Sequence, residues 1–250
     1  MENKLTCAMD IGEQMLLSGA EVHRAEESIR RMCSAFGAVR TDVFIITSSM
    51  VVTVFTADGK TFTQTRRITS TTSDFEKLHL LNQLSRRICQ TELTEEQIRK
   101  ELDAAVNRKS YPFWLECLCY AGIAGAFTLF FGGGFTEMLV SLAVGALVRF
   151  GILIIDGLTF NKIFSKFFSA ALATLLACLA VKIGWVHTVD KIIIGNIMTL
   201  IPGIGLTNAL RDLFTGDSIA GLLRSIEAAL TALAIAAGYV VIVFVWGMIL

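Results

Sequence analysis

The residues best suited to chemistry lie between positions 196 and 227, inside an otherwise apolar part of the chain. Pro202 and Gly203 interrupt an apolar run there. Because proline removes one backbone donor and clashes with the preceding turn, a helix through this run is predicted to break. Backbone groups freed by a break within lipid must face protein or a water-filled cavity, and many transporters bind substrate at such discontinuous helices. A simple proline kink in a packed bundle is the alternative interpretation.

Hydrogen-bonding and charged side chains surround this break and define a candidate substrate site. The candidate binding or pathway residues are Asn196, Thr199, Pro202, Gly203, Gly205, Thr207, Asn208, Arg211, Asp212 and Glu227. Amides at the start of a helix that follows Gly205 are suited to a substrate carboxylate. In this interpretation Arg211 pairs with the anion and Glu227 accepts a proton. A solvated loop end is the alternative for Arg211 and Asp212.

A second polar cluster lies near the N-terminus and is a candidate regulatory or interface patch. It contains Glu21, His23, Arg24 and Glu26. The three histidines of the chain are scattered, and the sequence contains no HExxH, GxSxG, P-loop or GxGxxG motif. We therefore expect no catalytic residues, no metal site, no cofactor and no ATP hydrolysis. The chain is not predicted to be an enzyme.

The composition divides the chain into two parts that meet near Pro112. Apolar residues make up 54% of the sequence, charged residues 18%, and the mean hydropathy is +0.62. An ordinary soluble domain is about 45–50% apolar and about 25% charged. Residues 1–110 hold 15 of the 22 basic and 15 of the 22 acidic side chains. Neither part is strongly basic, so we expect no nucleic-acid partner.

Residues 1–110 are predicted to form a soluble α+β domain with helices on one face of a small sheet. Apolar residues recur at helical spacing over residues 8–36, and Gly19 is expected to divide this stretch into two helices. The segments 41–56 and 61–68 are rich in β-branched and aromatic residues, which predicts two or three antiparallel strands.

Two further helices are expected to complete this domain. Asp74 is predicted to cap a helix that runs through Gln90. The segment 94–97 reads Thr-Glu-Glu-Gln, a capping box that opens another helix through Arg108.

Residues 111–250 are predicted to form an α-helical transmembrane bundle of about five spans. A span needs roughly 20 apolar residues to cross about 30 Å of hydrocarbon. The predicted spans are 113–131, 135–155, 164–183, 191–214, broken at Pro202–Gly203, and 219–250. As a helix the last segment would run about 48 Å. It must therefore tilt strongly or begin outside the hydrocarbon.

The distribution of Lys and Arg near the spans predicts the orientation. Lys and Arg are concentrated before the first span and in or beside the connections 156–163 and 215–218. Cytoplasmic loops of membrane proteins carry such an excess of basic residues. The N-terminal domain is therefore expected in the cytoplasm. Five spans would place Leu250 on the far side of the membrane, whereas four would place both ends inside.

Three segments resemble the bacterial threonine/serine exporter family. They are 18–26 (SGAEVHRAE), 81–86 (LNQLSR) and 194–217 (IGNIMTLIPGIGLTNALRDLFTGD), of which the last is the most specific. The resemblance covers nearly the whole chain and implies a multi-pass protein of the bacterial cytoplasmic (inner) membrane. Full-length members join a cytoplasmic domain to about ten spans, so a chain with about five resembles the first component of a split exporter. The resemblance then implies a second, smaller membrane chain as partner and either amino acids or succinate as substrate.

We therefore expect a subunit of a secondary-active exporter of small polar metabolites, either threonine/serine-type amino acids or dicarboxylates such as succinate. An oligomer within the lipid bilayer is expected as well. The alternative is a membrane-anchored enzyme or ligand sensor that acts through the cytoplasmic domain, around the patch near the N-terminus. The predicted break favours the exporter, because a passive anchor has no reason to interrupt a helix within lipid.

Overall fold

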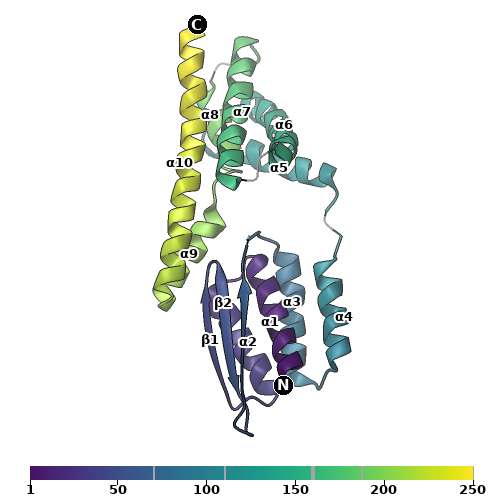
Figure 1. Ribbon diagram of the computed structural model, residues 1–250. Coiled ribbons are helices and arrows are strands. Elements are labelled where there is room, and N and C mark those ends of the chain that lie inside the picture. Colours follow the sequence, from purple (N-terminus) through teal and green to yellow (C-terminus); the bar gives the residue numbers. More distant parts are fainter. Residues whose placement is uncertain (70, 110, 159–160, 187, 250) are drawn as a thin grey trace. The chain divides into compact units, whose positions relative to one another are not determined.

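The chain divides into two compact units in the computed structural model, which describes residues 1–69, 71–109, 111–158, 161–186 and 188–249 (Figure 1). Unit 1 comprises Met1–Lys109 together with Gly205–Ser225. Unit 2 comprises Ser110–Ile204 together with Ile226–Leu250. The sequence analysis assigned residues 205–225 to the transmembrane part. Of the three histidines, His187 lies outside the described residues.

Unit 1 packs helices against one face of a three-stranded antiparallel sheet. Its elements up to residue 109 are α1 (Glu2–Leu17), α2 (Val22–Ala35), β1 (Arg40–Ile46), β2 (Ser49–Phe55), β3 (Thr61–Arg67), α3 (Phe75–Gln90) and α4 (Glu95–Val106). The strand order is β1-β2-β3, with Val43 opposite Val52 and Val52 opposite Gln64. Alternate residues of β2, Met50, Val52 and Val54, are buried in the same hydrophobic cluster as residues of α1 and α2. This period of two is what a strand with one covered face requires.

The local sequence features predicted for unit 1 are present. Gly19 has a φ of +92°, a conformation that favours glycine, and it separates α1 from α2. The carboxylate of Asp74 accepts the N–H of Lys77 at the start of α3. Thr94 and Gln97 form both hydrogen bonds of the capping box of α4. That helix ends at Val106 rather than at Arg108.

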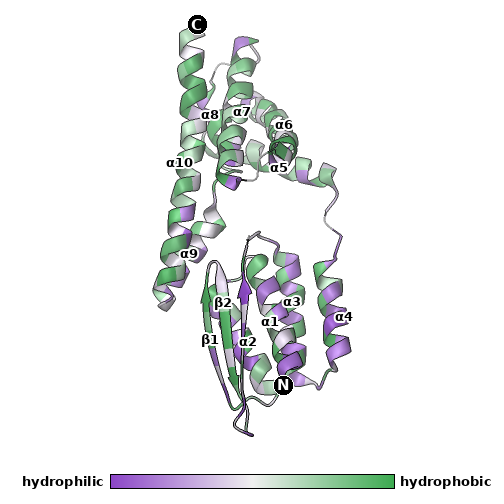
Figure 2. Cartoon of the chain, in the orientation of Figure 1, coloured by the Kyte–Doolittle hydropathy of each residue, from purple (hydrophilic) through white to green (hydrophobic). Residues whose placement is uncertain are grey.

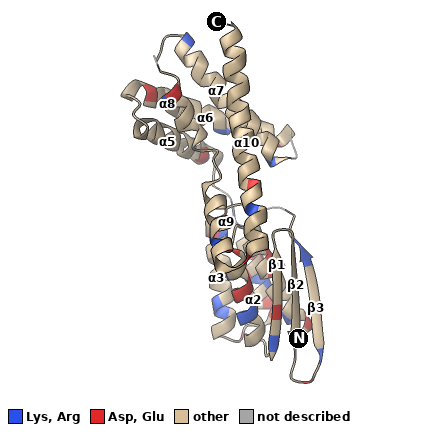
Figure 3. Cartoon of the chain, turned by 90° about the vertical axis from the view of Figure 1, so that its left-hand side faces the viewer, with Lys and Arg blue, Asp and Glu red and all other residues tan. Residues whose placement is uncertain are grey.

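Unit 2 is built from long apolar helices. They are α5 (Phe113–Phe130), α6 (Phe135–Leu158), α7 (Lys162–Lys182), the short α8 (Asp190–Ile197), and the larger part of α10 (Ser218–Ile249). Helices α5, α6 and α8 pack on one another, and α7 packs on α6 and α8. Many of their large apolar side chains are exposed, and hydrophobic residues dominate these helices (Figure 2). Charged residues are sparse along these helices and denser on α2 and α3 (Figure 3), so the outer surface of unit 2 suits lipid.

The structure corrects the predicted number of spans. Within the described residues, four helices are long and apolar enough to cross a bilayer: α5, α6, α7 and α10. The predicted span 191–214 is instead two helices, α8 of 8 residues and α9 (Gly203–Thr215) of 13. At 1.5 Å per residue α9 covers only about 20 Å. Pro202, which cannot continue the α8 ladder, is the physical reason.

Helix α10 is longer than a perpendicular crossing because its first turns belong to unit 1. Ala220 is buried within the hydrophobic core cluster of that unit. Only the part of α10 from Ile226 onward belongs to unit 2. Whether α10 tilts or begins outside the hydrocarbon stays a prediction.

Candidate functional site

The helix break predicted at Pro202–Gly203 is present. Helix α8 ends at Ile197, and the chain then tightens into a turn, since the N–H of Leu200 donates to the carbonyl of Ile197 at 2.8 Å. Thr199 uses its hydroxyl to bond the carbonyl of Asn196 at 2.7 Å. Helix α9 begins at Gly203. The two predicted residues that precede the break therefore lie together at the end of α8.

Asn196 belongs to a buried polar cluster inside unit 2, which we define as Thr128 of α5, Ser141 of α6 and Asn196 of α8. All three side chains are at most 1% exposed. The Nδ2 of Asn196 donates to Ser141 Oγ at 2.8 Å and to the carbonyl of Ile192 at 2.9 Å. The hydroxyls of Thr128 and Ser141 lie 2.7 Å apart, and both reach the carbonyl of Ala124. Three helices thus meet at one hydrogen-bonded point.

One hydrogen-bond acceptor of this cluster has no donor among the described residues. Asn196 Oδ1 is buried and has no hydrogen-bond partner among the described residues. Each hydroxyl of the cluster carries a single proton, and those of Thr128 and Ser141 point toward each other or toward the backbone of α5. A buried acceptor without a donor costs about 1–3 kcal/mol. Asn196 Oδ1 at the end of α8 therefore retains the capacity to accept a hydrogen bond.

Small residues allow the three helices to approach closely at the cluster. A Cβ at Gly195 would lie 2.7 Å from the carbonyl of Ala124 and would also overlap Thr128 Oγ1. A Cβ at Gly145 would lie 2.9 Å from the carbonyl of Tyr120. Such small residues are typical of helix contacts in membranes, where they permit hydrogen bonds between helices. The glycines hold the cluster together and leave little room around it.

The sequence analysis missed Thr128 and Ser141 as members of the site. The pattern that could have identified them is their position as polar residues in the middle of the apolar segments 113–131 and 135–155. The ion pair between Glu116 and Arg149 was also not predicted from the sequence. Arg149 Nε donates to Glu116 Oε2 at 3.0 Å. The Arg149 guanidinium lies 5.2 Å from the centroid of the Phe113 ring. Paired charges between membrane helices commonly face the interior of a bundle.

The predicted residues that follow the break lie on α9 in unit 1, together with residues near the N-terminus. Arg211 Nη1 donates to Glu21 Oε1 at 2.8 Å. Arg224 Nη1 donates to Asp212 Oδ2 at 2.8 Å, and its Nη2 donates to the carbonyl of Ala20 at 3.2 Å. We call Glu21, Arg211, Asp212 and Arg224 the latch. Two of the segments that carry the family resemblance, 18–26 and 194–217, thus meet here.

The remaining predicted residues are mostly at the surface. Gly205 and Thr207 are exposed on α9, and Asn208 is half-buried. Glu227 is exposed on α10. Arg224 pairs with Asp212 and not with Glu227, although the spacing of three residues along α10 would permit the latter contact. Asn196 is therefore the most deeply buried of the predicted substrate residues in unit 2.

The patch near the N-terminus engages other parts of its own unit. Glu26 Oε1 accepts the N–H of Ile45 at 3.2 Å, and Glu26 Oε2 lies 3.8 Å from Arg30 Nη2. Burial, and secondarily the nearby carboxylate of Asp217, raise the pKa of Glu26. His23 and Arg24 are exposed. The patch is thus partly a contact surface within unit 1.

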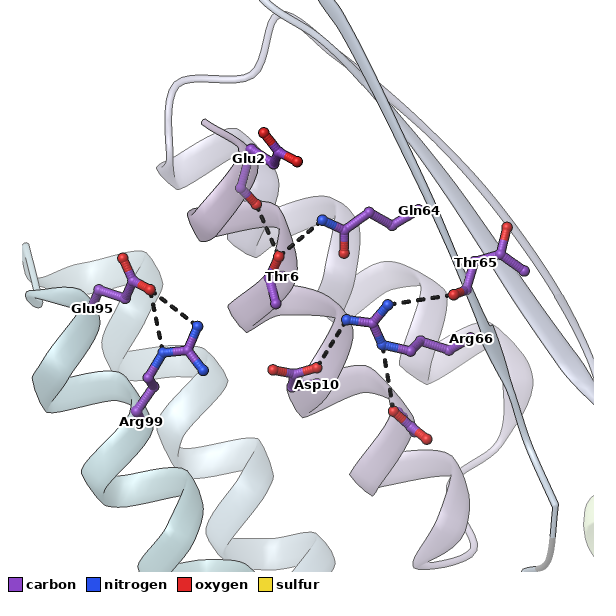
Figure 4. A network of polar contacts seen from close by, with 9 residues as sticks. Glu2, Thr6, Asp10, Gln64, Thr65, Arg66, Glu95 and Arg99 are labelled. Atoms are coloured by element: carbon purple, nitrogen blue, oxygen red, sulfur yellow. Dashed lines mark hydrogen bonds and ion pairs between the residues drawn. The ribbon is translucent and has the colours of Figure 1, made fainter.

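A cavity of about 260 Å³ lies between α1 and α4. It is lined by Asp10, Glu13, Gln14, Arg99, Leu102, Asp103 and Val106. Two of its charged side chains are paired within unit 1 (Figure 4): Asp10 lies 3.2 Å from Arg66 of β3, and Arg99 lies 3.0 Å from Glu95. Burial raises the pKa of Glu13 despite the nearby Arg66. The cavity is a polar groove whose walls are tied to the sheet.

Comparisons with known proteins identify relatives over nearly the whole chain. A family model described as a threonine/serine exporter matches residues 6–246. A probable threonine/serine exporter of Mycobacterium tuberculosis is 26% identical over 223 residues, which cover 88% of this chain and 42% of that protein. A threonine/serine exporter of Corynebacterium glutamicum is 27% identical over 251 residues, with coverages of 94% and 49%.

A third relative matches nearly end to end. It is a probable succinate transporter subunit of Klebsiella aerogenes, 23% identical over 238 residues that cover 94% of this chain and 90% of that protein. The chain therefore spans about half the length of the two threonine/serine exporters and most of the length of this subunit. No solved structure matches the chain.

Proposed function

The chain belongs to the threonine/serine exporter family, and from this premise we propose that it is one subunit of a secondary-active exporter of small polar metabolites. The family and the four apolar helices make it a multi-pass membrane protein. Its two proposed substrate classes are threonine/serine-type amino acids, as in the names of two relatives, and dicarboxylates such as succinate, as in the name of the third.

We place the substrate site at the end of α8, next to the break. The observation that carries this proposal is the unpaired Oδ1 of Asn196, which is 1% exposed and directly precedes the turn that ends at Pro202. Amino acids carry an ammonium group and hydroxyls, and protonated dicarboxylates carry O–H groups, so both classes supply the missing donor. The N–H groups in the first turn of α9 that follow Gly203 are suited to the carboxylate end.

A second, smaller membrane chain of the same family is proposed to complete the transporter. The structure supplies four crossing helices within the described residues, and the two exporters named above are about twice as long as the region matched here. Transporter sites commonly lie between two repeats, so a single repeat leaves one wall of the site to be supplied. We also propose that the protein lies in the bacterial cytoplasmic membrane with α1–α4 in the cytoplasm.

Efflux from whole cells tests this function. Cells that lack their own exporters are loaded with labelled threonine, serine or succinate and express this chain alone or together with its neighbouring membrane chain. Efflux of one of these probes only in the co-expressing cells is the expected result, and it would name the substrate. Absence of efflux for all three probes, with both chains shown to be in the membrane, would contradict the proposal.

The alternative of a ligand sensor or enzyme in the N-terminal domain has less support. The carboxylates of its patch bond to other parts of unit 1, and Asp10 and Arg99 of the cavity between α1 and α4 form ion pairs with Arg66 and Glu95. The unpaired acceptor lies instead in unit 2.

A further inference from the structure

Helix α9 is fixed within unit 1 by a narrow strip of its surface. Only Ala209 and Asp212 are buried among its residues. Its other face carries Leu206, Leu210 and Phe214, which are all exposed. Little apolar area therefore holds α9, and an element with few buried contacts is one that moves at low cost.

The latch supplies the specific contacts that this narrow strip lacks. Asp212 is 1% exposed, and its carboxylate also accepts the N–H of Val22 at the N-terminal end of α2. Glu21 precedes that helix as its N-cap residue. Arg224, which is largely buried, bonds both Asp212 and the carbonyl of Ala20. Three consecutive residues at the start of α2 are thus bonded to α9 and α10.

The latch lies close to the break along the chain. Helix α9 begins one residue after Pro202, and Asp212 lies less than three turns further on. Within a helix every backbone hydrogen bond links neighbouring turns, so a displacement at Asp212 carries the first turn with it. The position of α9 on α2 therefore sets where the chain leaves the break.

We propose that Glu21, Arg211, Asp212 and Arg224 are positioning residues for transport, which fix α9 against the start of α2 and so control the chain segment that follows the break. This inference rests on the proposed exporter function. In it the N-terminal domain acts on the substrate site through α9, without touching the substrate. Arg211 then serves the latch and not the substrate anion.

Charge exchange at the Glu21–Arg211 pair tests the latch, because the Arg211 side chain is 60% exposed and the Glu21 side chain 16%, so that only Arg211→Glu places its new charge at a well-exposed position. Arg211→Glu and Glu21→Arg are each expected to lower the maximal export rate about fivefold, the effect of roughly 1 kcal/mol for one surface pair. The half-saturating substrate concentration should change less than the rate, because Asn196 at the end of α8 is unaltered and only the first turn of α9 is displaced. The double variant, which restores opposite charges, should return the rate to within about twofold of the wild type. Arg67→Glu, the same charge change on β3, is the matched control and should export normally.

A second measurement on the full chain in lipid nanodiscs is independent of transport. Amide hydrogen exchange over residues 203–215 should be faster in Arg211→Glu and should return to the wild-type rate in the double variant. Failure of the double variant to restore both export and amide protection would overturn the proposal. Absence of export by the wild type with labelled threonine, serine and succinate would instead contradict the exporter function, while the exchange comparison would still decide whether the latch holds α9.

Discussion

Replacement of Asn196 by alanine should stabilise the protein while it abolishes export. The variant loses the hydrogen bonds of Nδ2 to Ser141 and to the Ile192 carbonyl, at about 0.6 kcal/mol each if both have the average value for bonds between membrane helices. It also removes the buried Oδ1 that has no partner, whose burial costs about 1–3 kcal/mol. The net expectation is a gain of about 1 kcal/mol in the free energy of unfolding, which corresponds to a rise of about 2–4 °C in Tm for a chain of this length.

Ser141→Ala is the matched control, because it removes the same hydrogen bond from the other side. It leaves the unpaired Oδ1 in place and also deprives Thr128 of its partner at 2.7 Å. We expect a loss of about 1 kcal/mol in the free energy of unfolding for this variant. The assay is thermal unfolding of the full chain in detergent, followed by circular dichroism. Equal decreases in Tm for Asn196→Ala and Ser141→Ala would refute the reasoning that Oδ1 is an unsatisfied acceptor kept for a ligand.

Two further predictions concern packing and pH. Gly195→Ala should lower the free energy of unfolding by about 1–3 kcal/mol, because the new Cβ would overlap Thr128 and the backbone of α5. Gly122→Ala is the control, because a Cβ at Gly122 meets nothing within 4 Å. Equal Tm values for the two variants would contradict the packing argument. The pKa of Glu26 is raised above its ordinary value of 4.5 by burial and by Asp217, so the folded chain binds this proton more readily than the unfolded chain. The stabilisation of the folded chain by protonated Glu26 is complete below pH 4.5 and disappears as the pH rises through the raised pKa of Glu26. Glu26→Gln should therefore flatten the dependence of Tm on pH in this range. An unchanged dependence would contradict the raised pKa of Glu26.

The local features of unit 1 could be predicted from the sequence because each depends on a few neighbouring residues. Gly19 supplies a positive φ between two helices, and Asp74 and Thr94 cap the helices that follow them. The break at Pro202 is equally local, since a proline interrupts a helical ladder wherever it lies. These predictions needed no knowledge of the packing of distant segments.

The features that the sequence analysis missed depend on contacts between distant segments. Residues 205–214 were assigned to the predicted span 191–214, yet they belong to unit 1, where Asp212 bonds the N–H of Val22 and the guanidinium of Arg224. Arg211 was expected to bind a substrate anion, and nothing in the sequence marks Glu21, 190 residues away, as its partner. The span count was too high for a related reason, since the two pieces on either side of Pro202 are each shorter than the bilayer.

The buried polar cluster could not be predicted from the sequence either. Thr128 and Ser141 are ordinary residues of apolar helices until α5, α6 and α8 are packed together by the glycines at 145 and 195. In the packed helices, Asn196 Oδ1 has no hydrogen-bond partner among the described residues, and this depends on contacts between segments that are distant in the sequence.

Transport by purified protein in liposomes tests the central claim most directly. The chain and its partner membrane chain are reconstituted, and the efflux of labelled threonine, serine and succinate is compared between the wild type and Asn196→Ala. The account predicts that the wild type exports at least one probe and that Asn196→Ala, although folded and at least as stable, exports none. Equal export by the two proteins would contradict a substrate site at the end of α8, and no export by the wild type would contradict the exporter itself.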